Sequence, residues 1–295
     1  MNEHVNDPDA GLAPAFVAPP HTCDAHFHVF GPAERYPCDA SDLRYRPPLA
    51  PLDSYLRTAR RLGFERFVFV QPSAYGQDNS CMLDAMAEVE PQRRRGIVHL
   101  DANAVVDARL AAWDAAGIRG IRINVSPVRR PEAGLADALK SRIARYAVVA
   151  RELGWHLDFL TPGWLTEELL PTLRALPVAF TVAHMGLFPA KDGPEQRGFQ
   201  ELLALAGDGS GRCWVKLTGI YRFSTDPTFA DVAPFAHALI AAAPDQLIWG
   251  SDFPHLSFHD LVGTIGLYNK LGEWADAAQR RRILADNPAR LFGFA

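Results

Sequence analysis

The amino-acid sequence predicts a single α/β domain folded as a (β/α)8 TIM barrel, and three observations lead to this fold class. Eight short apolar runs alternate with eight longer amphipathic runs, starting at residue 23. The alternation occupies about 250 residues, the usual size of such a barrel. The alternative, an open doubly wound sheet, would carry a glycine-rich phosphate turn after a strand, but GPA follows the first strand instead of GxGxxG.

The predicted strands are apolar on consecutive positions, as parallel strands buried on both faces are. They span residues 23–29, 66–71, 96–100, 118–123, 155–160, 180–185, 213–217 and 246–250. The predicted helices lie between them and after the last, and the clearest has apolar residues recurring on one face until Gly154 stops it. These helices span residues 51–62, 79–90, 106–116, 136–153, 164–175, 196–207, 229–243 and 259–272.

Two terminal segments complete the predicted chain. A last amphipathic run, residues 276–292, predicts a C-terminal helix. Residues 1–20 hold four prolines and little periodicity. We therefore expect a loose N-terminal arm over residues 1–20, or a strap across a partner subunit, ahead of one barrel over residues 21–295.

Composition narrows the class of function. The 295 residues include 48% hydrophobic and 22% charged side chains, with a net charge of −4, which gives no electrostatic footprint for nucleic acid or an acidic membrane. No apolar run is long enough to predict a membrane span, and the first residues lack the basic and apolar regions of a signal peptide. The four cysteines lie far apart, which argues against a disulfide framework or structural zinc and predicts a cytoplasmic protein. Homo-oligomerisation stays open.

Polar residues at the carboxyl ends of barrel strands point into the active site. The fifth predicted strand ends in Leu160-Thr161 and offers nothing ionisable there. The other predicted strand ends supply His26 and His28, Ser73, His99, Arg122 with Asn124, His184, Lys216 followed by Arg222, and Asp252. Three histidines and one aspartate therefore converge from the first, sixth and eighth strands.

The histidine pair and the aspartate are the strongest candidates for catalytic residues. His26 and His28 are two positions apart, so both rings project from one face of a strand and can reach one metal ion or one substrate oxygen. Asp252 ends an apolar strand, where a carboxylate is costly to bury without a partner or a role. The structural alternatives are core histidines held by hydrogen bonds, including His184, and a helix N-cap for Asp252.

Four motifs resemble the amidohydrolase superfamily, in its lactonase-like amidohydrolase 2 branch. They are DAHFHVFG, VAHMG, WGSDFPH and the terminal DNPARLFGF, and the resemblance runs from about residue 22 to the C-terminus. Three further stretches, FVFVQPSAYGQDN, GIRGIRIN and WVKLTGIYR, are similar to the 2-pyrone-4,6-dicarboxylate hydrolases of that branch. The resemblance implies a TIM barrel, lactone hydrolysis and a place in aromatic compound catabolism.

The resemblance also implies roles for individual residues. The matching catalytic residues are His26, His28, His184 and Asp252, and the matching substrate contacts are Arg122, Arg222, Ser73 and Tyr45. Val128 stands where the pyrone hydrolases have a third arginine, which Arg129 or Arg130 could replace. Leu160 stands where they have a tyrosine, so the identity of the acid is open.

The resemblance implies a hydrolase that opens the ester ring of a small carboxylated lactone without a metal. Asp252 would take a proton from water, the histidines would polarise the carbonyl, and the arginines would bind carboxylate. A two-metal centre is not expected, because Arg122 and Leu160 stand where a bridging and a histidine ligand are needed. One zinc or manganese ion on His26, His28, His184 and Asp252 is the alternative.

Other interpretations stay open at this stage. They are a single-metal lactonase of a sugar-acid lactone, a metal-dependent decarboxylase of an aromatic acid, and a binding barrel without activity. Arg122 and Arg222 could instead form structural ion pairs, and Lys216 could pair with Asp252 or another acid. We expect His255 and His259 at the rim, and His156 at the inert end of the barrel.

Overall fold

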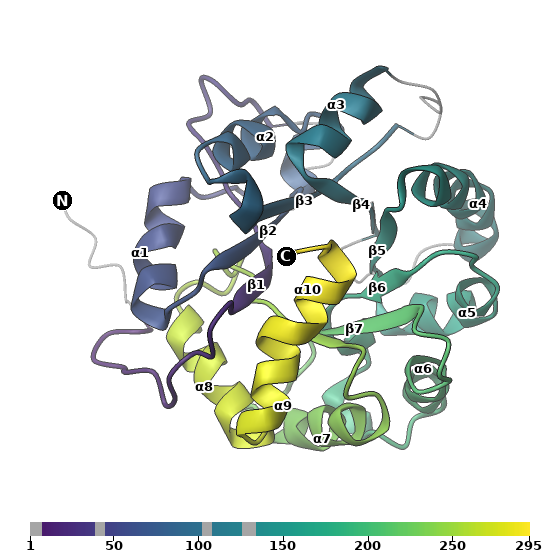
Figure 1. Ribbon diagram of the computed structural model, residues 1–295. Helices are drawn as coiled ribbons and strands as arrows, with labels where there is room; N and C mark the ends of the chain where they lie inside the picture. The colour runs from purple at the N-terminus through teal and green to yellow at the C-terminus, as the bar shows by residue number, and fades with distance from the viewer. Residues whose placement is uncertain (1–7, 39–44, 102–107, 126–133) are drawn as a thin grey trace.

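A computed structural model describes residues 8–38, 45–101, 108–125 and 134–295, and its architecture is the predicted barrel. Eight parallel strands pair in chain order, and the helices between them form an outer ring (Figure 1). The strands are β1 (Cys23–Phe27), β2 (Arg66–Val70), β3 (Arg94–Val98), β4 (Ile118–Asn124), β5 (His156–Leu160), β6 (Phe180–Val182), β7 (Cys213–Leu217) and β8 (Leu247–Trp249).

The outer ring follows the predicted helices closely. Its helices are α1 (Leu52–Leu62), α2 (Ser80–Ala87), α3 (Ala108–Ala116), α4 (Leu135–Leu153), α5 (Gly163–Arg174), α6 (Arg197–Ala206), α7 (Ala233–Ala242) and α8 (Thr264–Trp274). No helix in the described ranges is long and apolar enough to cross a membrane. Three strands differ from prediction by two residues or more: β1 ends at Phe27, so that His28 lies just beyond it, β3 lies two residues earlier, and β6 ends at Val182, so that His184 lies in a turn beyond it.

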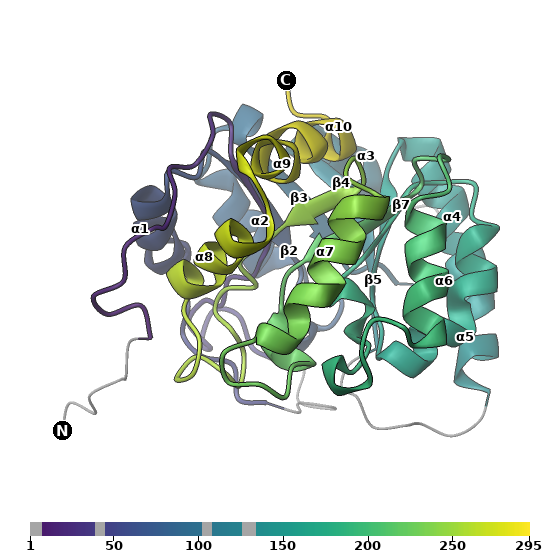
Figure 2. The same ribbon diagram turned by 90° about the horizontal axis from the view of Figure 1, so that it is seen from below.

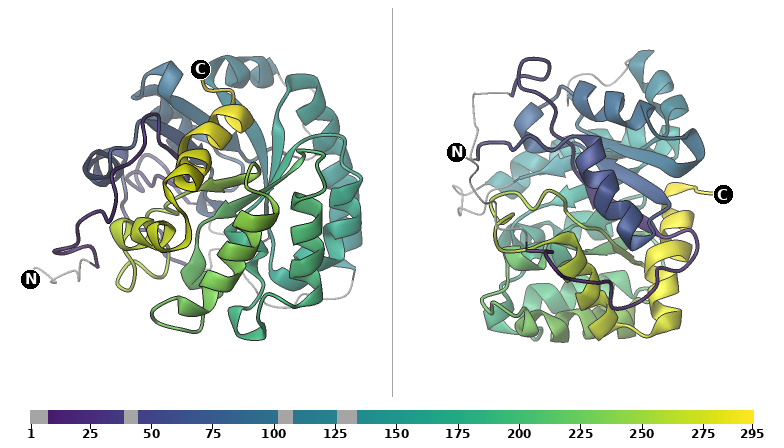
Figure 3. Two further views of the ribbon diagram at one scale, coloured as in Figure 1. Left: turned by 60° about the horizontal axis from the view of Figure 1, so that its bottom comes forward. Right: turned by 90° about the vertical axis from the view of Figure 1, so that its left-hand side faces the viewer.

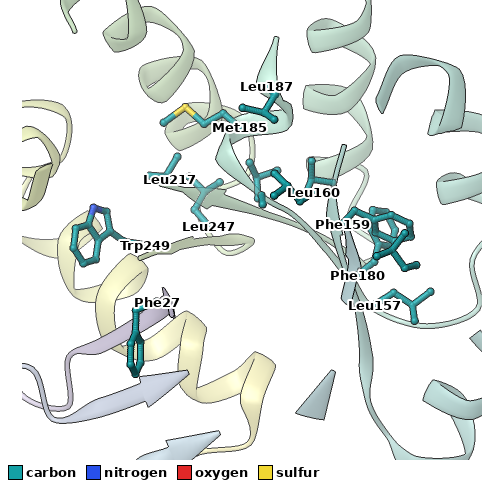
Figure 4. Close-up of a cluster of buried hydrophobic side chains, with 14 of the residues drawn as sticks. Phe27, Leu157, Phe159, Leu160, Phe180, Met185, Leu187, Leu217, Leu247 and Trp249 are labelled. Carbon is teal, nitrogen blue, oxygen red and sulfur yellow. The ribbon is translucent and has the colours of Figure 1, made fainter. Parts of the chain in front are cut away.

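Most of the apolar core lies between the sheet and the helices. Phe159 of β5 and Phe180 of β6 point outward together, with ring centres 6.1 Å apart in a T-shaped pair (Figure 4). Phe27 of β1 stacks on Tyr55 of α1 at 3.8 Å. These contacts fix the strands against the helices and so hold the strand ends in place.

The C-terminal segment covers the amino ends of the strands. The predicted run 276–292 forms α9 (Ala277–Arg281), a π-helical turn (Arg282–Asp286) and α10 (Asn287–Phe292), which together cross one end of the barrel (Figure 2). Phe292 and Phe294 pack with barrel residues such as Val68 and Ile97. Arg95 donates to the carbonyls of Phe292 at 3.0 Å and Gly293 at 2.6 Å. This end is closed, which leaves the carboxyl ends of the strands for a site.

The N-terminal arm is bound to its own barrel from residue 8 onward, so the expectation of a loose arm is wrong for this part. The Asp9 carboxylate accepts hydrogen bonds from the backbone of Ile265 at 3.0 Å and Gly266 at 3.1 Å, at the start of α8. Phe16 stacks on Tyr268 at 4.2 Å. Figure 3 shows this segment running past α1 and α8 before it enters β1. Such long-range contacts leave no periodic signal in the sequence.

Candidate active site

Backbone hydrogen bonds connect β1 to the segment that follows β8, at the carboxyl ends of the two strands. The backbone amide of Asp252 donates to the carbonyl of His26, and the amide of His28 donates to the carbonyl of Phe253, both at 2.8 Å. An added Cβ on Gly250 would lie 2.5 Å from Cβ of His26, so only glycine permits this approach. These contacts place Asp252 directly beside His26 of β1 and His28, which follows β1.

Two of the predicted catalytic residues have unusual backbones. Asp252 has φ of 58° and His184 has φ of 52°, both in the left-handed region that residues with a Cβ rarely adopt. Each such residue costs on the order of 1–3 kcal/mol and persists only where the surrounding structure imposes it. Strained residues cluster at functional sites, and these two meet across the barrel mouth.

The carboxylate of Asp252 is the centre of the site. Its Oδ2 accepts hydrogen bonds from the Tyr221 hydroxyl at 2.6 Å and from Arg222 Nε at 2.9 Å. Burial alone would raise the pKa of Asp252, but the charge of Arg222 and the neighbouring His184 outweigh it and hold the pKa well below its ordinary value. Asp252 is therefore a buried anion, and a helix N-cap role is not what its contacts show.

The three predicted histidines surround this anion. His26 Nε2 and His28 Nε2 each lie 3.5 Å from Asp252 Oδ1, and His184 Nε2 lies 3.9 Å from Oδ2. His28 lies one residue beyond β1, but its ring and that of His26 both face Asp252, so the expectation that the two rings can reach one point is confirmed. Burial is the main cause that lowers the pKa of each ring, to about 3 for His184. All three imidazoles are therefore neutral at neutral pH.

Two polar atoms at this centre have no hydrogen-bond partner within the described ranges. They are His26 Nε2 and Asp252 Oδ1, and both are buried. Their separation of 3.5 Å is too long for a good direct hydrogen bond. Buried polar atoms are almost always paired, so this pair of atoms indicates where a reacting molecule is received.

The far sides of the histidine rings are each held by a different partner. His28 Nδ1 lies 2.8 Å from the carbonyl of Val70, which can only accept, so this nitrogen carries the proton. His184 Nδ1 lies 3.2 Å from the hydroxyl of Thr218. His26 Nδ1 lies 3.2 Å from the Lys216 ammonium. The three rings are thus oriented from outside the centre.

A buried acid missed by the sequence analysis lies beneath the site. Asp158 is in β5, two residues before the strand end, and the sequence analysis considered only the end itself, which has nothing ionisable. Asp158 pairs with Arg122 Nη1 at 2.5 Å and with Lys216 Nζ at 2.6 Å, and all three side chains are buried. The ion-pair alternative therefore holds for Arg122, and Lys216 pairs with Asp158 rather than Asp252.

The predicted substrate contacts lie near the arginines. Tyr45 and Ser73 share a hydrogen bond of 3.1 Å between their hydroxyls. Burial raises the pKa of Tyr45, and the hydrogen bond with Ser73 and the positive charges of Arg122 and Arg222 oppose this shift. Arg130, together with Val128 and Arg129, lies outside the described residues.

The structure also tests the predicted places of three other histidines and adds one tyrosine that the sequence analysis missed. His255 is buried and bonded to Thr264 at 3.3 Å, so its predicted place at the rim is wrong, whereas His259 is exposed as expected. His156 begins β5 and touches the ring of Phe292 at the closed end, as predicted. Tyr221 was missed because its signal, a tyrosine beside Arg222, is weak in sequence alone.

One group of residues has the spacing of a cation site. His26, His184 and Asp252 each offer one ligand atom, and these atoms lie within 4.8 Å of one another. A histidine ligand must present a bare nitrogen to the ion. Lys216 Nζ lies 3.2 Å from Nδ1 of His26, and a lysine that donates there puts the ring proton on Nε2, the nitrogen that faces Asp252. The group therefore fits a cation by spacing, whereas a donating Lys216 would leave His26 no bare nitrogen to offer it.

Comparison with known proteins agrees with this geometry. The Amidohydro_2 (amidohydrolase) family model matches residues 23–294. A 4-sulfomuconolactone hydrolase of Hydrogenophaga intermedia is 36% identical over 94% of this chain and 90% of its own. A 2-pyrone-4,6-dicarboxylate hydrolase of Comamonas testosteroni is 31% identical over 95% of this chain and 92% of its own.

A solved structure from Acinetobacter baumannii is also similar. It is described as a probable 2-pyrone-4,6-dicarboxylic acid hydrolase with citric acid bound, and is 26% identical with a TM-score of 0.76. The match covers 93% of this chain and all of that one (100%). The family model and the relatives extend over almost the whole barrel, including each strand end that supplies the site. The chain belongs to the amidohydrolase family.

Proposed function

We propose that this enzyme hydrolyses the ring ester of a small anionic lactone, of the type of 2-pyrone-4,6-dicarboxylate. The observation that carries the proposal is the unpartnered pair His26 Nε2 and Asp252 Oδ1, 3.5 Å apart and buried beside Arg222. The named activities of the relatives, on 4-sulfomuconolactone and 2-pyrone-4,6-dicarboxylate, support the substrate class. Both names describe lactones that carry acidic groups.

The reaction follows from the roles of these atoms. A water molecule adds to the lactone carbonyl, and Asp252 Oδ1 takes its proton. His26 Nε2–H donates to the carbonyl oxygen as negative charge develops there. The ring carbon–oxygen bond then breaks, and the departing oxygen takes the proton from Asp252. His28, whose Nε2 is bare, can accept a hydrogen bond from the other O–H of the water and so orient it.

Arg222 links substrate charge to the base. Its Nε is bonded to Asp252 Oδ2, and its side chain is 23% exposed, so the rest of the guanidinium can meet a substrate anion. A substrate carboxylate that shares this cation weakens its pull on Asp252 and raises the proton affinity of the base. The anionic group of the substrate thus makes Asp252 a stronger general base for the attacking water.

We propose that this chemistry runs without a resident metal. The two alternatives from the sequence, a metal-dependent sugar-acid lactonase and a decarboxylase of an aromatic acid, both need a cation at the histidines. The contact between Lys216 and His26 disfavours that cation. Arg222 and the neutral imidazoles supply the positive charge and the donors that a cation would otherwise provide.

The first prediction concerns the base. Asp252→Asn keeps the shape of the side chain but loses its charge, so kcat for lactone hydrolysis should fall by about 10²- to 10⁴-fold. Ring opening is followed by ultraviolet absorbance, and thermal unfolding checks that the variant folds. Near-normal turnover in a folded variant would remove Asp252 from this role.

The second prediction concerns the charge of the substrate. Arg222→Met should lower kcat/KM for 2-pyrone-4,6-dicarboxylate by about 10- to 100-fold, the equivalent of one lost charge-assisted contact. Unsubstituted 2-pyrone should lose less, because it is affected only by the lost contact between Arg222 and Asp252 and not by a lost anion contact. Arg197→Met, at an exposed arginine, is the control and should leave both substrates unchanged. An equal loss for both lactones in Arg222→Met would contradict the anion-binding role.

The third prediction concerns the position of His184. An added Cβ on Gly219, whose φ is +57°, would lie 2.3 Å from His184 Nδ1. Gly219→Ala should therefore displace the ring and lower kcat by about 10²-fold. Gly209→Ala is the matched control, because it has a similar φ of +77° and nothing within 4 Å of the added Cβ. Equal kcat values for the two variants would show that the position of the His184 ring does not affect turnover.

A further inference from the structure

A row of buried charges runs beneath the candidate active site. Arg122 of β4, Asp158 of β5 and Thr181 of β6 are register partners on neighbouring strands, so their side chains lie side by side. Lys216 of β7 continues the row, because its Nζ lies 2.6 Å from Asp158 Oδ1. The row ends at His26 Nδ1, 3.2 Å from the same Nζ. Four strands are thereby connected to one catalytic ring of β1.

Asp158 is the ion-pair partner of the lysine in this row. The carboxylate accepts from Arg122, Lys216 and the Thr181 hydroxyl, three donors that hold it as an anion. Lys216 has 0% of its side chain exposed, so burial lowers its pKa, and the ion pair with Asp158 at 2.6 Å opposes this shift and favours the ammonium form. An ammonium group has hydrogens to give and no lone pair to offer. The ring nitrogen that faces it must therefore be bare.

We propose that Lys216 is a positioning residue that holds His26 in the tautomer with its proton on Nε2. His26 then presents an N–H to the unpartnered space beside Asp252, where the lactone carbonyl is received; this role rests on the proposed function. The carbonyl of Val70 imposes the opposite tautomer on His28. Two histidines only two positions apart, near the end of β1 and just beyond it, thus have different roles, one as donor and one as acceptor.

The same contact excludes a cation from His26. A nitrogen that carries a proton cannot ligate a metal ion, and moving the proton to Nδ1 would direct it at the Lys216 ammonium. Lys216 thereby selects hydrogen-bond catalysis over metal binding at a cluster whose spacing would suit either. The chain achieves this with a residue that does not touch the substrate.

The direct test reads the tautomer itself. Long-range proton–nitrogen NMR spectra of ¹⁵N-histidine-labelled protein, dialysed against a strong chelator, distinguish a protonated from a bare ring nitrogen. His26 is assigned as the signal that is missing in His26→Gln. The wild-type protein should show a protonated Nε2 and a bare Nδ1, and should keep them after zinc is added. A proton on Nδ1, before or after zinc, would overturn the proposal.

A variant gives the second arm of the test. Lys216→Met should populate the other tautomer and lower kcat by between about tenfold and 10²-fold, with KM about unchanged, because a transition-state donor is lost in part of the molecules. Thr181→Val is the control: it removes a hydrogen bond to Asp158 but leaves the contact of Lys216 with His26, so the tautomer should stay as in the wild type. An unchanged His26 spectrum in a folded Lys216→Met would also overturn the proposal.

The two arms separate this proposal from the proposed function. The spectrum of the wild-type protein needs no substrate and does not depend on Lys216→Met, and His26→Gln serves only to assign it. If no lactone is hydrolysed but His26 carries its proton on Nε2, the proposed function fails and the role of Lys216 in fixing the tautomer stands. If lactones are hydrolysed and His26 carries its proton on Nδ1, the role of Lys216 fails alone.

Discussion

The buried negative charge of Asp252 is the constraint on which the rest of the site depends. A carboxylate removed from water costs several kcal/mol unless charges and hydrogen bonds compensate for it. Here Tyr221 and Arg222 hold one oxygen, while the other faces His26 and His28 with no bonded partner among the described residues. The two oxygens are therefore unlike. One anchors the side chain in its left-handed backbone, and the other remains for chemistry.

The histidines around the Asp252 anion are neutral. If the rings were protonated, they would compensate the negative charge of Asp252 themselves, and the charge of Arg222 would not be needed for this. Because burial lowers the pKa of the rings, they act as oriented dipoles, each set by a partner on its far side. Such fixed donors and acceptors cost no reorganisation when charge develops on a substrate. The row from Arg122 to Lys216 supplies that orientation for His26 and ties it to the packing of the sheet.

The sequence predicted the barrel and the His/Asp cluster because both depend on local patterns, namely alternation of elements and polar residues at strand ends. Asp158 was missed because its role depends on the register between β4 and β5, which places it beside Arg122 and cannot be read along one strand. His255 and the arm around Asp9 were misjudged for a related reason: burial of a loop or a proline-rich segment is decided by contacts far away in the chain. Tyr221 lies in a short turn (Ile220–Arg222) after β7 that has no periodicity.

The central claim is that an ionised Asp252, three neutral histidines and nearby arginines open an anionic lactone without a cation. The most direct measurement compares kcat/KM for 2-pyrone-4,6-dicarboxylate and unsubstituted 2-pyrone, before and after dialysis of the protein against a strong chelator. The account predicts that activity survives the chelator, and that the dicarboxylate is preferred by about 10- to 100-fold, as one charge-assisted contact with Arg222 would give. Activity that is lost to the chelator and restored by zinc or manganese would contradict it.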